Sequence, residues 1–182
     1  MPHRLPKLVA LSLAWVLACA PAVSQSDPYA PIGQLLRAQQ YEQALIAANT
    51  YLDSNPRDPQ MRLLLGVTHA ERGDFAQAKA VYLQLTQEFP ELPEPHNNLA
   101  TVYAQESNFD QARASLEMAV RLNPNYALAH ENLGDVYVRL ARESYTRAAS
   151  LDPSAVTVGP KRIQLDTVLR PPASSTNPKP QP

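Results

Sequence analysis

The sequence predicts an all-α protein, built as a solenoid of about three to four stacked helical hairpins. Three series of residues share one 34-residue period along the chain. The series are Ala44, Ala78 and Ala112; Tyr41, Phe75 and Phe109; and Pro56, Pro90 and Pro124. A fixed period of this length is typical of a hairpin that recurs and stacks, because one hairpin cannot bury its own apolar face.

The two regular units are expected at residues 59–92 and 93–126. Small residues at positions 66, 78, 100 and 112 allow the helices of a hairpin to approach closely, and large residues fill the space around each contact. The large residues are Leu65, Tyr82, Leu99, Tyr103 and Leu116. Turn-forming residues separate the two helices of each unit, and a proline ends the second helix. These residues are Gly73-Asp74, Ser107-Asn108, Pro90 and Pro124.

This arrangement resembles the tetratricopeptide repeat, a 34-residue pattern of two antiparallel helices. The matching marks are the pairs Leu65-Gly66 and Leu99-Ala100, then Tyr103, and the alanines, aromatics and prolines of the three series. The resemblance covers residues 31–153. It implies a scaffold whose first helices line a concave surface, and it is specific for fold rather than function, because members of this family differ in their partners.

The first unit, residues 28–58, departs from the pattern. Its second helix is expected over Tyr41 to Ser54, whereas its first helix is short, starts near Pro31 and lacks the Leu-Gly pair. We interpret this partial unit as an N-terminal cap of the array.

The fourth unit, residues 127–153, is shortened. It begins regularly, but the marks of its second helix arrive five residues early, at Ala141, Tyr145, Ala148 and Pro153. Charges of alternating sign pass through the place of the missing turn with a spacing that supports a helix. They are Asp135, Arg139, Glu143 and Arg147. The pattern predicts one continuous helix from Ala127 to Ser150; the alternative is a tight turn near Leu140-Ala141. A continuous helix would leave its far half without a hairpin mate and open to a second subunit.

The C-terminal part divides into two segments. Residues 154–170 are expected to form a cap, with a short helix over Pro160 to Arg170 that covers the last repeat. Residues 171–182 contain five prolines and no large apolar side chain, so a disordered tail is predicted; a polyproline ligand is the alternative.

Residues 1–24 have the order of a secretory signal peptide. A positive start precedes the apolar run from Leu8 to Ala18, which is too short for a membrane anchor, and small residues follow. Two processing routes fit. One is ordinary cleavage after Ala22 or Ser24; the other is lipidation of Cys19, because residues 16–19 resemble a bacterial lipobox. The protein is therefore expected to be exported, to the periplasm or alternatively as an outer-membrane lipoprotein, with no membrane contact except through that lipid.

Composition and motifs exclude several classes of function. The 16 basic and 17 acidic residues are spread along the chain, which argues against nucleic acid as a partner. One cysteine cannot form an internal disulfide or a cysteine-based zinc site. His69, His96 and His130 occupy positions of large residues in the repeat, so we interpret them as structural. With no phosphate-binding loop or nucleophile elbow, we expect no enzyme activity, no cofactor and no metal.

The resemblance places a partner-binding groove along the first helices. The residues expected to face it are Leu63, Val67 and Ala70 of the second unit; Asn97, Asn98, Thr101 and Gln105 of the third; and Glu131, Asn132, Asp135 and Arg139 of the fourth. Asn98 and Asn132 are equivalent, and their amides can bind an extended peptide backbone. The groove grades from apolar to acidic, which suits a peptide with an apolar segment followed by a basic one. The lysines of the family's carboxylate clamp are missing here, so a C-terminal carboxylate ligand is not expected.

The sequence as a whole predicts a non-enzymatic adaptor or scaffold of the bacterial cell envelope. It would bind a protein or peptide partner in the concave groove. The alternative is a structural assembly protein that forms homo-oligomers through the long helix of the fourth unit, without a peptide ligand.

Overall fold

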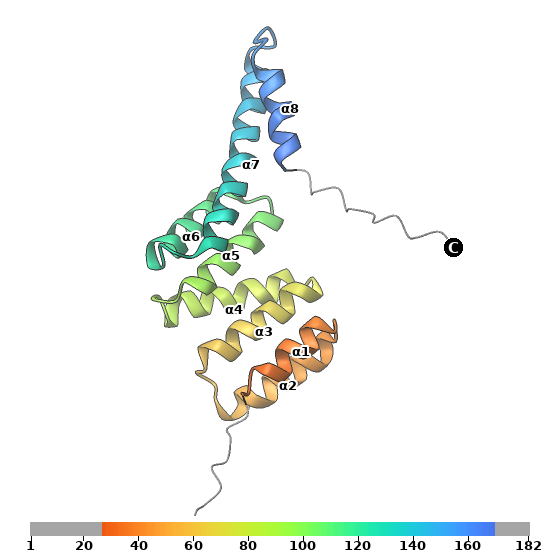
Figure 1. Cartoon of the computed structure of the whole chain (residues 1–182), viewed down its shortest axis with the longest axis vertical. Helices are drawn as coiled ribbons and strands as arrows, with labels where there is room; N and C mark the ends of the chain where they lie inside the picture. The colour runs from red at the N-terminus through yellow and green to blue at the C-terminus, as the bar shows by residue number, and fades with distance from the viewer. Residues whose placement is uncertain (1–26, 170–182) are drawn as a thin grey trace, which may run out of the picture.

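The computed structural model describes residues 27–169, and all regular structure in this range is helical. The helices are α1 (Ala30–Arg37), α2 (Tyr41–Ser54), α3 (Pro59–Arg72), α4 (Phe75–Glu88), α5 (Pro93–Gln105), α6 (Phe109–Leu122), α7 (Ala127–Leu151) and α8 (Val158–Val168). Figure 1 shows antiparallel hairpins stacked along the long axis of the molecule, with α7 and α8 projecting from one end. The predicted all-α solenoid is confirmed.

The first three hairpins have the same type of turn between their two helices. Gln39, Gly73 and Ser107 all have positive φ angles, of 57°, 91° and 58°, and they occupy the same position in successive repeats. The amide of the following residue donates a hydrogen bond of 2.8 to 2.9 Å to the carbonyl five residues earlier, which satisfies the end of the first helix. Only glycine adopts this backbone without strain, so Gln39 and Ser107 hold it through the packing of their hairpins.

Asp58 joins the partial first unit to the second. Its Oδ1 accepts the Met61 amide at 3.0 Å and so caps α3, and its Oδ2 accepts the hydroxyls of Tyr29 and Tyr51 at 2.9 Å each. These hydrogen bonds to a carboxylate raise the pKa of Tyr29 to about 12. Two tyrosines of the first unit are thereby fixed to the start of α3.

The buried residues of the core recur with the 34-residue period. The alanines at 44, 78 and 112 are completely buried, and each belongs to one of three apolar clusters along the stack. In the second unit Gly66 lies so close to the Tyr82 ring that an added Cβ would collide with it. The small residue at this position therefore seats a large one from the second helix, as close helix packing requires.

The fourth unit is not a hairpin. Helix α7 runs without a break from Ala127 to Leu151, so the continuous helix is confirmed and the turn near Leu140-Ala141 is wrong. The expectation that the far half of α7 lacks a mate is also wrong, because α8 folds back along it and Arg142 Nε lies 2.5 Å from Asp166 Oδ1. Within the described chain α8 packs on α7 alone, so the predicted C-terminal helix covers the fourth unit and does not touch the third hairpin.

Some predictions fall elsewhere in the chain. The signal peptide with Cys19 and the proline-rich tail at 171–182 lie outside the described residues. Between residues 27 and 169, no helix combines the length and apolar character needed to cross a bilayer.

Candidate partner-binding groove

The first helices α3, α5 and α7 line a continuous hollow, which we call the groove. Three adjoining cavities of about 290, 250 and 130 Å³ make it up. Thr101 lines all three cavities, and Asn132 and Gln105 each line two. The groove therefore extends over three units, with α5 at its centre.

Three asparagines connect α5 to α7 inside the groove. Asn97 is only 1% exposed; its Oδ1 accepts a hydrogen bond of 2.9 Å from Asn132 Nδ2, and its Nδ2 donates one of 3.2 Å to Asn98 Oδ1. Both polar atoms of the buried Asn97 side chain are thus satisfied. The asparagine chain fixes the orientation of the two outer amides, leaving Asn132 Oδ1 as an acceptor toward the groove.

Tyr82 closes the floor between α3 and α5. It is 1% exposed, and its ring reaches past Gly66 to line the largest of the three groove cavities beside Asn98. Burial raises the pKa of Tyr82, and a hydrogen bond from the Asn98 side chain acts in the opposite direction. The hydroxyl is therefore neutral at physiological pH.

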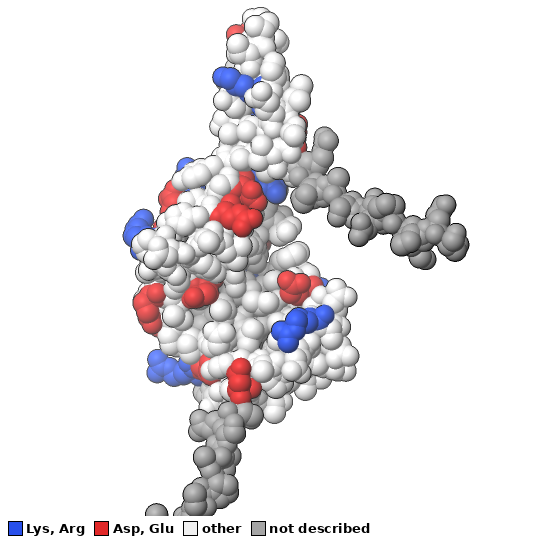
Figure 2. Space-filling view, in the orientation of Figure 1, with Lys and Arg blue, Asp and Glu red and all other residues white. Residues whose placement is uncertain are grey.

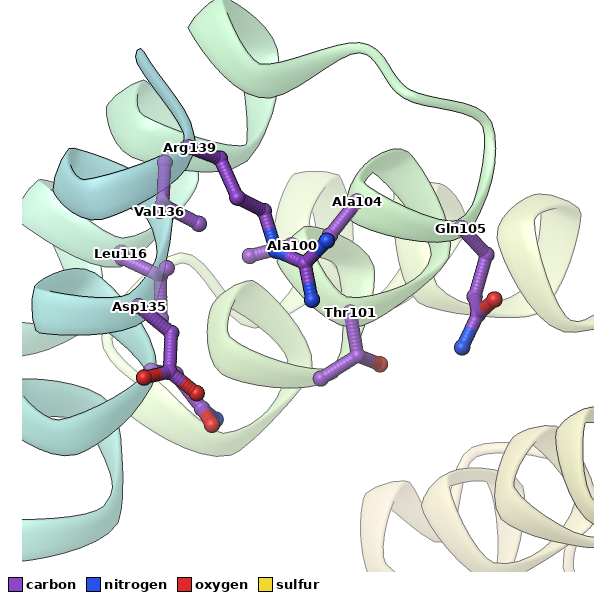
Figure 3. A pocket seen from close by; sticks show the side chains of 9 residues that line it. Ala100, Thr101, Ala104, Gln105, Leu116, Asp135, Val136 and Arg139 are labelled. Carbon is purple, nitrogen blue, oxygen red and sulfur yellow. The ribbon is translucent and has the colours of Figure 1, made fainter. Parts of the chain in front are cut away.

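The C-terminal end of the groove combines an apolar floor with two opposite charges (Figure 3). Ala100, Ala104 and Leu116 line the cavity of about 130 Å³, and Asp135 and Arg139 come from successive turns of α7. The Arg139 guanidinium lies 5.7 Å from the centre of the Phe109 ring, a cation–π distance. Among the described residues Asp135 has no ion-pair partner, which leaves its carboxylate available at the groove.

The structure brings together nine of the eleven residues that the sequence pattern places in the groove. They are Val67, Ala70, Asn97, Asn98, Thr101, Gln105, Asn132, Asp135 and Arg139. Leu63 instead packs against the core around Tyr82 and Leu99, and Glu131 is exposed outside the cavities. Whether these residues bind a partner stays a prediction.

At the cavity of about 290 Å³, sequence reasoning missed three contributors, namely Tyr82, Glu71 and Leu128. Tyr82 belongs to a second helix, where groove residues are not expected. Gly66 could have indicated its role, because the absence of a side chain at Gly66 lets the Tyr82 ring reach the groove. Glu71 places a carboxylate near the middle of the hollow, so the gradient from apolar to acidic is less simple than the sequence suggested.

His96 and His130 form hydrogen bonds to the backbone near the starts of their helices. His130 Nε2 lies 3.0 Å from the Pro124 carbonyl, and His96 has the equivalent hydrogen bond to Pro90, one repeat earlier. Burial lowers the pKa of His96, which favours the neutral ring. Over residues 27–169 no group of three or more His, Cys, Asp or Glu side chains is placed to hold a metal ion.

Stacked antiparallel hairpins around a concave groove define a helical-repeat scaffold of the kind that binds other proteins. Family comparisons agree with the 34-residue period: residues 34–93 match a model described as "Tetratricopeptide repeat", and residues 101–140 match one described as "TPR repeat". The chain belongs to the tetratricopeptide-repeat family.

Several solved structures are similar to this chain. TTC0263, a TPR protein of Thermus thermophilus, is 23% identical with a TM-score of 0.59, over 78% of this chain and 81% of its own. The first TPR of Spaghetti (RPAP3), solved with the HSP90 peptide SRMEEVD, is 15% identical with a TM-score of 0.58, over 63% and 90%. YrrB, described as a TPR protein with an unusual peptide-binding site, is 23% identical with a TM-score of 0.53, over 57% and 54%. Identities this low support the fold alone, and a search among curated proteins finds no match.

Proposed function

We propose that this protein is a non-enzymatic adaptor of the bacterial cell envelope that binds an extended segment of a partner protein in the groove. The carrying observation is the continuity of the three cavities across α3, α5 and α7, with Thr101 common to all of them. A solenoid groove of this kind suits an extended chain, because each stacked unit offers a further contact along its length.

The residues of the groove favour a particular ligand chemistry. Val67, Ala70 and Leu128 offer an apolar surface at the groove cavity of about 290 Å³, and the amide of Asn132 offers hydrogen bonds to a peptide backbone. Glu71 and Asp135 add carboxylates at the middle and at the C-terminal end. We therefore expect a segment with an apolar side chain near α3 and a basic one near Asp135.

The location in the envelope rests on residues 1–24 and is part of the same proposal. Fractionation of a bacterium that expresses the chain tests it: export predicts a shortened protein outside the cytoplasm. Lipidation predicts that a Cys19→Ser variant moves from the membrane to the soluble periplasmic fraction. A full-length protein in the cytoplasm would contradict the proposed location.

Binding is tested with two charge reversals on the same helix. Asp135→Lys changes the groove, whereas Glu143→Lys makes the same change on the part of α7 beyond it. A panel of immobilised peptides that combine an apolar and a basic residue is compared for wild type and both variants. We expect binding to be lost with Asp135→Lys and kept with Glu143→Lys. Equal binding by all three proteins, or no preference for basic peptides, would contradict the proposed ligand chemistry.

Capture from crosslinked envelope fractions then identifies the partner. The same pair of variants serves as probe and control, with thermal stability checked for each. Proteins that are retained by wild type and Glu143→Lys but lost with Asp135→Lys are groove partners. A set of captured proteins that is identical for all three would place the working surface outside the groove.

A further inference from the structure

In the fourth unit, the space beside Gly134 that an aromatic ring fills in the second unit is empty. We call this space the seat. Gly134 occupies the repeat position of Gly66, two repeats earlier, where the Tyr82 ring leaves no room for a Cβ. A Cβ added to Gly134 would meet no atom within 4 Å. The small residue that lets an aromatic approach is present, but the aromatic is not there.

The side chain that the repeat assigns to this seat is Tyr145. In the second unit Tyr82 touches Gly66 of its own unit and Asn98 of the next one. Tyr145 makes only the second kind of contact: Lys161 of α8, at the place of Asn98, lies 5.2 Å from the centre of its ring. Because α7 is continuous, Tyr145 is 11 residues beyond Gly134, about 16 Å along the helix at 1.5 Å per residue.

The chain cannot bring Tyr145 back to its own Gly134 without unwinding α7. In the regular units about three residues, such as 106–108, separate the two helices and include the one with positive φ. The five missing residues leave none for this purpose in the fourth unit, where residues 138–141 continue inside α7. Within the described residues, Tyr145 can therefore reach such a seat only on a second copy of the chain.

The continuous helix also gathers the packing residues of both halves on one face. We call this face the α7 stripe. It consists of His130, Gly134, Tyr137, Ala141, Tyr145 and Ala148. Their steps of three and four residues keep them on one side of a helix, and large and small side chains alternate along it.

Such a stripe is complementary to a second copy of itself. In an antiparallel pair centred near residue 139, each large side chain meets a small one: Tyr137 faces Ala141 of the partner subunit, and Tyr145 faces Gly134 of the partner subunit. This is the arrangement of a two-fold symmetric interface. The first pair of α7 residues outside these two, His130 and Ala148, follows the same rule.

The burial pattern shows that this part of the molecule is incompletely covered. None of the three core clusters described includes a residue beyond Leu140. Tyr137 remains 48% exposed, although its hydroxyl is held by Glu117, and Leu151 and Ile163 are exposed on the projecting pair. Figure 2 shows few charged side chains on the visible face of this projection.

We propose that two copies of this chain exchange their fourth units: residues 141–151 of each α7, with α8 attached, pack on residues 127–140 of the other, so that Tyr145 fills the seat at Gly134. The exchange restores in trans the hairpin that the deletion of the turn removed in cis. It leaves the groove residues on a different face of α7, so it does not depend on the proposed peptide ligand.

Gly134→Leu separates the exchanged dimer from the single chain. A Cβ at this exposed position meets no atom within 4 Å, and leucine favours a helix interior more than glycine does, so the monomer should fold with unchanged or higher thermal stability. In the dimer the leucine occupies the place of Tyr145, and we expect dimerisation to weaken about tenfold or more. The control is Glu143→Leu, at a repeat position that is exposed in the regular units, as Ala80 and Ala114 show.

Sedimentation of the purified chain over a range of concentrations gives the first result. A dimer in wild type and Glu143→Leu, shifted toward monomer in Gly134→Leu, supports the exchange. A wild-type chain that stays monomeric throughout, or a dimer that Gly134→Leu leaves unchanged, overturns it.

A disulfide provides an independent test. Positions 134 and 145 are too far apart along one helix to be bridged within it, because a disulfide needs Cα atoms within about 7 Å. In a Cys19→Ser background, Gly134→Cys with Tyr145→Cys should oxidise to a covalent dimer that reducing agent reverses. The control pair, Gly134→Cys with Glu143→Cys, should crosslink much less. An intramolecular disulfide would show a closed hairpin within one chain, and thiols that stay reduced in wild-type-like protein would also overturn the exchange.

Discussion

The second and fourth units carry the same marks of the repeat, yet one is a closed hairpin and the other a rod. In the second unit the turn at Gly73 returns α4 against α3, and Tyr82 is buried over Gly66. In the fourth unit five residues are missing, α7 continues past the place of the turn, and Gly134 is left open. The comparison teaches that the length of the turn, more than the packing residues, decides whether a unit closes on itself.

The largest expected effect distinguishes the cores of a closed unit and of the open one. Leu99→Ala removes a side chain that is 4% exposed and should cost about 2–5 kcal/mol of unfolding free energy. Leu133→Ala, at the equivalent position of the next repeat on the half-buried side of α7, should cost less than half of that because fewer neighbours surround it. Chemical denaturation of both variants measures the difference, and equal losses would show that the fourth unit is as well packed as the third.

Restoring the missing turn should convert the open unit into a closed one. We would insert five residues with a glycine at the positive-φ position between Leu140 and Ala141. Tyr145 could then reach Gly134 within the same chain, and burying it should add about 1.5–3 kcal/mol to the unfolding free energy. Thermal melts measure the gain, and sedimentation should show a monomer. A variant less stable than wild type would mean that the continuous helix is preferred for reasons beyond turn length.

At the N-terminal end of the solenoid, the Asp58 carboxylate joins the first unit to α3, so the stability of this end should depend on pH. Burial acts to raise the pKa of Asp58, but hydrogen bonds from the Met61 amide and the two tyrosine hydroxyls lower it overall from 3.8. A carboxylate with a lowered pKa stabilises the folded state above its unfolded pKa, and this contribution is lost as pH falls through the folded value. Asp58→Asn should cost about 1–3 kcal/mol at neutral pH, through weaker hydrogen bonds.

The measurement is unfolding of wild type and Asp58→Asn at neutral pH and near pH 3. The two proteins should differ at neutral pH and converge in acid, because protonation removes the charge that the variant lacks. A difference that is the same at both pH values would assign the effect to shape and not to charge.

The smallest expected effects have opposite signs in the closed third unit and the open fourth unit. Ser107 holds a φ of 58° in a closed turn, so Ser107→Gly should stabilise by about 0.5–1 kcal/mol. Ala141, at the place of the missing turn in the fourth unit, lies inside α7, so Ala141→Gly should destabilise by about 0.5–1 kcal/mol. Two thermal melts against wild type are sufficient. The same sign for both substitutions would contradict the difference in backbone between the two units.

Much of the groove followed from repeat position alone. Asn98, Thr101 and Asn132 line it because first helices in a stacked array always present the same face to the concave side. Leu63 and Glu131 do not line it, since the face that a helix turns to its neighbours also depends on how the superhelix curves. The buried role of Asn97 depends on Asn132, a partner in the next repeat that no local pattern contains.

The sequence by itself determined the helices, their hairpins and the continuity of α7, because these follow from a period of 34, from turn residues and from charges at helical spacing. Only the tertiary structure decided that Tyr82 reaches the groove, that the asparagine chain joins α5 to α7, and that α8 returns along the far half of α7. The physical reason is range: a helix and its turn depend on residues within about one turn of each other, whereas these contacts depend on where distant helices meet.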